Sequence, residues 1–189
     1  MSKPHRIAKN HFSVRIHDIS SPPDSQILDG FDASYSTEYI YSISVRGMTP
    51  TILEEKLADP LHKIYRRQDI EESLLDAEYT VIAEVDGRVA GFAAFKFEEW
   101  NKRAVMTGIY VQPRYKGRGI GAALVKSGVK YAKTVSARCL WLETQNVNHP
   151  AIRFYLRSGF RFCGFDTSLY DPAAMTPRET AVFFSMDLT

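Results

Sequence analysis

The chain has 189 residues, of which 44% are hydrophobic and 24% charged, values typical of one soluble globular domain with a sizeable core. Its 24 Lys and Arg residues nearly balance 22 Asp and Glu residues, so the formal net charge is only +2. This balance argues against nucleic acid or an anionic membrane as partner, because such binders carry a concentrated basic excess. No apolar stretch reaches the ~18 residues that span a bilayer, and no apolar segment of a secretory signal follows the basic N-terminus. We therefore expect a cytoplasmic protein.

The first half of the chain predicts mostly strands. A strand is expected over 12–19, before the break at SSPPDS. Residues 37–45 alternate and are rich in β-branched and aromatic side chains, and 49–57 favour a strand over a short helix. Residues 66–77 carry apolar side chains at 70, 74 and 75 on a charged background, which predicts a helix. Two β-rich runs then flank Asp86-Gly87, the residue pair that a tight hairpin turn prefers.

The second half alternates strands and helices. The expected elements are a strand over 103–111, a helix over 119–133, a buried strand over 138–144, a helix from Pro150 to Gly159, and strands over 160–170 and 180–188. Strands that are joined through helices imply a partly parallel sheet. The sequence therefore predicts a single α/β domain with a mixed sheet.

The two cysteines, Cys139 and Cys163, both lie in apolar segments. Their spacing fits no zinc site, and two cysteines make no disulfide framework. We expect two buried thiols that act as small hydrophobic side chains. The five histidines show no metal-binding spacing either, so no metal is predicted.

A glycine-rich loop, VQPRYKGRGIGAAL over 111–124, links a predicted strand to a predicted helix. The N-terminus of a helix presents unpaired N–H groups, and glycine lets a ligand approach the backbone closely. Lys116 and Arg118 add positive charge, so the loop predicts a site for an anion such as phosphate. Its G-x-G-x-G spacing matches neither a P-loop nor a dinucleotide-binding loop.

Two motifs in order resemble those of the GNAT superfamily of N-acetyltransferases. The glycine loop resembles that superfamily's acetyl-CoA pyrophosphate loop, and Asn148-His149-Pro150-Ala151, Tyr155 and Gly159-Phe160 resemble its second signature. Within the superfamily, residues 100–101, 140–148 and 159–171 look like the streptothricin (nourseothricin) acetyltransferases. The resemblance implies one GNAT domain over 1–189, with six to seven sheet strands, a signature region at about 79–170 and a more variable part over 1–34.

The resemblance also implies how acetyl-CoA is held. The strand before the loop pairs its backbone with the pantetheine arm, and the loop amides hold the pyrophosphate. The matching Asn contacts the cofactor arm, while the matching Tyr lies by the thioester sulfur and protonates the leaving thiolate. The implied cofactor-binding residues are Ile109, Tyr110, Val111, Lys116, Gly117, Arg118, Gly119, Ile120, Gly121, Ala122, Asn148 and Tyr155.

The general base departs from the family pattern. Many family members carry Glu or Asp on the strand before the loop, and streptothricin acetyltransferases tend to have acidic residues where this chain has Thr107 and Gly108. Because an amine must lose a proton to attack, another base is needed. The remaining candidates are Glu143 on the next strand, Glu99 and Glu98. Trp100 beside them, with Glu99, is expected to line the acceptor pocket.

The predicted function is transfer of acetyl from acetyl-CoA to a primary amine of a small cationic molecule, with a streptothricin-type antibiotic as the best named acceptor. The acidic run over 69–78 is either a source of negative field for such a substrate or the solvated face of a helix. A peptide or protein N-acetyltransferase and a non-catalytic acyl-CoA-binding module remain as alternatives. The C-terminal strands could also support a homodimer.

Overall fold

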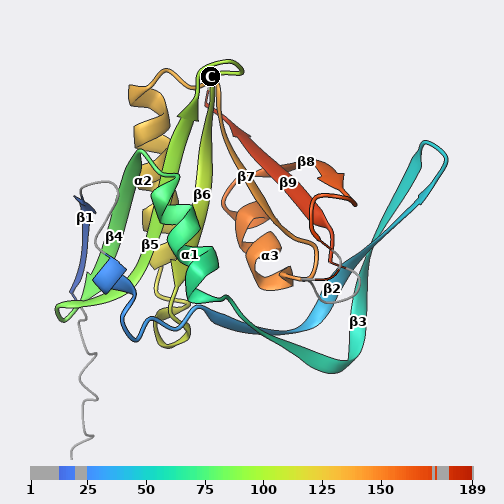
Figure 1. The fold of residues 1–189 in the computed structure, drawn as a ribbon, viewed down its shortest axis with the longest axis horizontal. Coiled ribbons are helices and arrows are strands. Elements are labelled where there is room, and N and C mark those ends of the chain that lie inside the picture. The colour runs from blue at the N-terminus through green and yellow to red at the C-terminus, as the bar shows by residue number, and fades with distance from the viewer. Residues whose placement is uncertain (1–12, 20–24, 172, 174–178, 189) are drawn as a thin grey trace, which may run out of the picture.

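A computed structural model of the chain describes residues 13–19, 25–171, 173 and 179–188. Its centre is a seven-stranded sheet in the order β1-β4-β5-β6-β7-β9-β8, from which a two-stranded hairpin, β2-β3, projects (Figure 1). Among the strands of the described residues, β6 and β7 are the one pair that runs parallel. The strands are β1 Val14–Ile19, β2 Ser34–Arg46, β3 Thr49–Ile64, β4 Tyr79–Val85, β5 Arg88–Glu98, β6 Arg103–Val111, β7 Cys139–Gln145, β8 Arg161–Asp166 and β9 Ala181–Asp187.

The helices cover both faces of the sheet. They are α1 Arg67–Leu75, α2 Ile120–Thr134 and α3 His149–Arg157, with short 3-10 turns η1 Ser25–Leu28 and η2 Pro113–Tyr115. Alternate residues of β4 and β5 point to opposite faces, as the period of a strand requires. One set, with Phe95, joins the larger core beneath α2 and α3, and the other, with Phe92, packs under α1 and η1. The expected single-domain α/β fold with a mixed sheet is confirmed.

The hairpin β2-β3 extends beyond what the sequence indicated. The strands expected over 37–45 and 49–57 exist, but they pair only with each other, and β3 continues to Ile64. The register shifts where residues 57–60 stand opposite the single residue Glu38. Pro60 lies within this bulge, where its missing N–H costs no ladder hydrogen bond. The proline therefore interrupts the pairing without ending the strand.

The strand expected over 160–170 ends at Asp166. The Asp166 carboxylate accepts hydrogen bonds from the backbone N–H and the hydroxyl of Ser168, both at 2.7 Å. Such a side-chain turn competes with the strand for backbone groups and redirects the chain. The segment up to Tyr170 consequently leaves the sheet.

The expectation of two buried thiols is half wrong. Cys139 is buried on β7, whereas Cys163 is exposed. Cys163 belongs to β8, the outermost strand of the sheet, so it has a neighbouring strand on one side only. An apolar run in the sequence does not distinguish an edge strand from a central one.

Candidate active site

A gap between β6 and β7 forms the centre of the site. The two strands pair over only four residue pairs, ending at Met106 and Leu142, and then diverge (Figure 1). At the point of divergence, Thr107 forms a β-bulge that has no partner on β5. The backbone of residues 109–111 therefore faces a gap instead of a neighbouring strand on the β7 side.

Two cavities open into this gap. One, of about 530 Å³, is lined by the glycine loop and by the first turns of α2 and α3. The other, of about 550 Å³, is lined by α1, the end of β3, and the diverging parts of β6 and β7. The residues that line both cavities are Tyr65, Ile109, Tyr110, Asn148, Ala151 and Tyr155. The cavities therefore share a boundary at which a group held in one can meet a group held in the other.

The glycine loop presents backbone amides to the first cavity. Gly117 and Gly119 have φ of 77° and 79°, a left-handed conformation that glycine adopts without strain. Helix α2 begins at Ile120, and its first i to i−4 bond runs from the N–H of Ala123 to the carbonyl of Gly119. The amides of residues 120–122 have no such partner inside the helix and carry its partial positive charge. This geometry suits a phosphate or pyrophosphate.

The two cationic residues of the loop differ in position. Lys116 lines the first cavity, and its Nζ donates to the carbonyl of Ser34 at 3.0 Å. Desolvation lowers the pKa of Lys116, an effect that the charge of Asp32 partly opposes. The Arg118 guanidinium lies outward over the ring of Tyr115, 5.6 Å from its centroid, and does not line the cavity. All the predicted cofactor residues except Arg118 line the first cavity.

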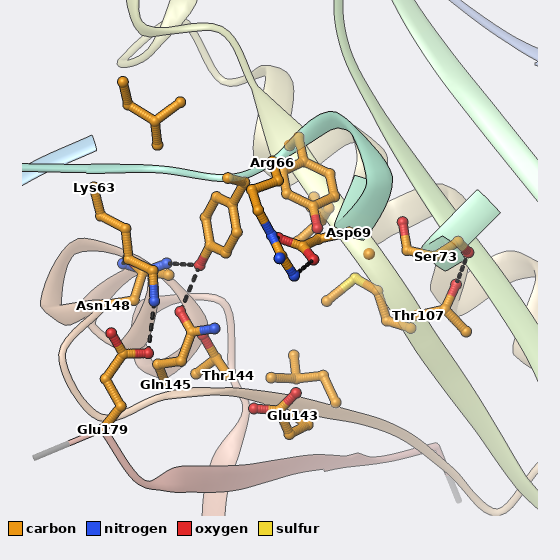
Figure 2. A pocket seen from close by; sticks show the side chains of 18 of the residues that line it. Lys63, Arg66, Asp69, Ser73, Thr107, Glu143, Thr144, Gln145, Asn148 and Glu179 are labelled. Carbon is orange, nitrogen blue, oxygen red and sulfur yellow. Dashed lines mark hydrogen bonds and ion pairs between the residues drawn. The ribbon is translucent and has the colours of Figure 1, made fainter. Parts of the chain in front are cut away.

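Asn148 is held where α3 begins. Its Oδ1 accepts from the N–H of Ala151 at 3.2 Å, which caps the helix. Its Nδ2 donates to the hydroxyl of Tyr65 at 2.9 Å, and that hydroxyl donates to Oε1 of Gln145 at 2.9 Å (Figure 2). Asn148 thus fixes the half-buried Tyr65 between the two cavities as well as the start of the helix.

Tyr155 lies at the boundary of the cavities. Its ring packs against Phe154, Phe160 and Phe184 with centroid distances of 5.5 to 6.0 Å. Burial, followed by electrostatic interactions with Tyr110 and then Glu143, raises the pKa of its hydroxyl well above the usual value. That hydroxyl has no hydrogen-bond partner among the described residues. Tyr155 is therefore a protonated donor facing the cavities, although the ring is part of the core.

Glu143 lines the second cavity from β7. Desolvation raises the pKa of its carboxyl, while a hydrogen bond from Tyr170 and the charge of Lys63 lower it. The Tyr170 hydroxyl donates to Oε1 of Glu143. Burial and the adjacent carboxylate raise the pKa of Tyr170, so this phenol remains a donor.

The positions of Thr107 and Gly108 are closed by α1. The Thr107 hydroxyl donates to the carbonyl of Ser73 at 2.8 Å (Figure 2). A Cβ on Gly108 would lie 2.7 Å from Oγ of Ser73 and 2.9 Å from Cε2 of Tyr110, closer than real contacts allow. Helix α1 therefore occupies the space that a carboxylate side chain would need at position 108.

The second cavity has an excess of negative charge. Its ionisable lining includes four carboxylates and two cationic side chains, Asp69, Glu72, Glu143, Glu179, Lys63 and Arg66. Figure 2 labels all of these except Glu72. Lys63 pairs with Glu179 at 2.6 Å, and Arg66 donates two hydrogen bonds to Asp69 at 2.6 and 3.0 Å. The carboxylates of Glu72 and Glu143 have no ion-pair partner within this lining, so the lining favours a cation. Two carboxylates of the acidic run over 69–78, those of Asp69 and Glu72, thus line the cavity.

Glu99 and Trp100 are not placed at the site. They lie in the turn between β5 and β6, and neither lines either of the two cavities. Trp100 is 83% exposed, and Glu99 pairs with Lys102. Glu98 also lies outside both cavities and accepts a hydrogen bond from Asn101 at 2.6 Å. The expectation that this turn lines the acceptor pocket therefore needs correction, because the turn is at the paired start of β6 and the cavities are at its diverging end.

Sequence reasoning missed several residues of the second cavity. Lys63 belongs to the unpredicted part of β3, Tyr65 follows the end of that strand, and Tyr170 follows the unpredicted end of β8. The available signals for Tyr170 were the Asp166 and Ser168 pair, which favours a turn, and the resemblance of residues 159–171 to streptothricin acetyltransferases.

Within the described residues, no group of three or more His, Cys, Asp or Glu side chains is arranged to hold a metal ion. None of the helices in that part of the chain has the length and apolar character to cross a bilayer.

Comparisons with known proteins agree with this geometry. The profile of the acetyltransferase (GNAT) family matches residues 38–160. The chain is 35% identical over 172 residues to streptothricin acetyltransferase of Streptomyces lavendulae, covering 87% of this chain and 90% of that protein. The crystal structure of nourseothricin acetyltransferase matches with a TM-score of 0.82 at 33% identity, covering 93% of this chain and 99% of that one. A Bacillus anthracis str. Ames structure in complex with acetyl coenzyme A matches with a TM-score of 0.73 at 26% identity, over 95% and 100% of the two chains.

Proposed function

Since the chain belongs to the GNAT family of acetyltransferases, we propose that it moves acetyl from acetyl-CoA directly to a primary amine of a streptothricin-type antibiotic. The observation that carries the proposal is the second cavity. It has more carboxylates than cations and meets the first cavity at Tyr155. A polycationic acceptor suits such a lining. The names of the two relatives above, streptothricin acetyltransferase and nourseothricin acetyltransferase, give this class of antibiotic as their acceptor.

In this proposal acetyl-CoA occupies the first cavity. The amides of residues 117–122 and the ammonium of Lys116 hold the pyrophosphate. The pantetheine arm lies in the gap between β6 and β7, where the backbone of residues 109–111 is free to pair with its amides. The thioester then reaches the boundary beside Tyr155.

The acceptor amine enters from the second cavity. Glu143 takes the proton of the ammonium, and the neutral nitrogen attacks the thioester carbonyl. The carbon–nitrogen bond forms and the carbon–sulfur bond breaks, with Tyr155 giving its hydroxyl proton to the departing thiolate. On becoming an amide the nitrogen loses a second proton, which passes through solvent to the phenolate of Tyr155, and solvent removes the first proton from Glu143. The two groups have suitable starting states, because Tyr155 is held protonated and Glu143 receives a hydrogen bond that favours its charged form.

The test is direct incubation of the protein with acetyl-CoA and a panel of amines that includes streptothricin, lysine, spermidine and N-terminal peptides. Release of the CoA thiol is followed together with the product mass. We expect streptothricin to gain one acetyl group with the highest kcat/KM of the panel. An unmodified streptothricin beside a rapidly acetylated peptide would refute the proposal.

A further inference from the structure

We propose that Tyr170 is a positioning residue of the acceptor site, which orients the Glu143 carboxylate and keeps it charged where the amine arrives. The inference rests on the proposed function for the reaction, but its geometry is independent of the acceptor. Tyr170 belongs to the segment that leaves the sheet after Asp166 and lies over the second cavity.

Glu143 lies on β7, and the neighbouring strand β6 contributes no carboxylate to the cavity. Gly108 has no room for a side chain because of Ser73, and the Thr107 hydroxyl is already bonded to the Ser73 carbonyl. The carboxylates of α1 lie on the opposite wall, where Asp69 is held by Arg66. The charge state of Glu143 therefore decides whether a base faces the boundary at Tyr155.

Burial works against that charge. The Glu143 carboxyl is desolvated, which favours its neutral form, and a neutral carboxyl neither attracts an ammonium nor accepts its proton. The hydroxyl of Tyr170 donates to Oε1 of Glu143, which favours the charged form. The phenol is itself held protonated by burial and by that carboxylate, so it does not compete for the proton.

The surroundings of Glu143 supply few other compensating charges. From β3, Lys63 favours the carboxylate, but its ammonium is shared with Glu179. From β6 and α3, Tyr110 and Tyr155 interact electrostatically with Glu143 as neutral phenols. Tyr170 is thus the one described side chain that donates a hydrogen bond to this carboxylate. In the proposal Tyr170 fixes Oε1, and Oε2 accepts the proton of the amine.

The experiment compares Tyr170→Phe with the wild-type enzyme over pH 5 to 9. Loss of a hydrogen bond to a charged group predicts that the acid limb of kcat/KM for streptothricin moves up by about one to two pH units. On the acid side of the limb, kcat/KM of Tyr170→Phe is at least about tenfold below the wild-type value, and at high pH the two values converge. Tyr131→Phe is the matched control, because Tyr131 also donates to a carboxylate, that of Glu78 at 2.9 Å, outside both cavities. Its profile should stay unchanged.

A second readout does not need an acceptor. Side-chain carboxyl resonances of ¹³C-labelled glutamate are titrated by NMR, with Glu143→Gln to assign the signal. The Glu143 resonance should titrate at higher pH in Tyr170→Phe than in the wild type, and Tyr170→Met replaces the Phe variant if that protein does not fold. An unchanged titration overturns the role of Tyr170. A shifted titration in a protein that leaves streptothricin intact supports the positioning role and refutes the proposed acceptor.

Discussion

Replacement of Gly108 by alanine tests whether α1 leaves no room for a side chain at this position. Streptothricin acetyltransferases, which the chain resembles, tend to carry an acidic residue there. The new Cβ would meet Oγ and Cβ of Ser73 at 2.7 and 3.1 Å and the ring of Tyr110 at 2.9 Å. Glycine inside a strand is usually worse than alanine by about 0.5–1 kcal/mol, so a roomy site would be stabilised. Overpacking of this kind costs about 1–3 kcal/mol, so after the glycine gain we expect a net loss of about 1–2 kcal/mol, or about 3–6 °C in Tm.

Urea unfolding followed by tryptophan fluorescence measures this loss, and Gly164→Ala is the matched control. Gly164 is also a strand glycine, but its added Cβ would lie 3.5 Å from Phe183, an ordinary contact. A double-mutant cycle with Ser73→Gly should recover about 1 kcal/mol of the Gly108→Ala loss, because the helix contacts are then removed. An unchanged midpoint for Gly108→Ala, or an equal loss in the Ser73→Gly background, would refute the reasoning.

Three further outcomes follow from the site. Tyr155→Phe should lower kcat at least about a hundredfold while calorimetry finds an unchanged Kd for acetyl-CoA, and equal turnover would remove its role as proton donor. Glu143→Gln should abolish the acid limb of the kcat/KM profile. Because desolvation raises the pKa of Glu143, the wild-type kcat/KM should rise with pH through a pKa above that of an exposed glutamate. An acid limb that persists in the variant would assign the limb to another group. Asn148→Ala should destabilise the protein by about 1 kcal/mol or more through loss of the α3 cap, whereas Asn148→Asp should restore the cap; thermal unfolding distinguishes them, and equal stability of all three proteins would contradict the capping assignment.

The cofactor side of the site could be predicted from the sequence because its function lies in contiguous backbone. A glycine loop that precedes a helix specifies its own geometry, and eleven of the twelve predicted residues line the first cavity. Arg118 is the exception, since its side chain can extend to either side of the loop and instead lies over Tyr115.

The acceptor side could not be predicted in the same way, because its residues come from segments far apart in the chain. Lys63, Asp69, Glu143 and Tyr170 belong to β3, α1, β7 and the segment after β8. These side chains come together only because β6 and β7 diverge and β3 continues past Pro60. No local sequence pattern predicts either feature. Glu99 and Trp100 illustrate the converse, because proximity in sequence to β6 placed them at its wrong end.

The exclusion of a side chain at Gly108 has a consequence for the direction from which the acceptor approaches. A base on β6 would receive the amine beside α1, whereas in the proposed reaction Glu143 on β7 receives it beside Tyr170. The acidic wall of α1 then lies across the cavity from the reacting nitrogen, where Asp69 and Glu72 can hold a second cationic group of the same molecule. A dication that spans the cavity should therefore be preferred to a monocation of equal amine basicity. That preference should weaken as salt rises, because screening reduces the attraction of the exposed Glu72 more than that of the half-buried Glu143.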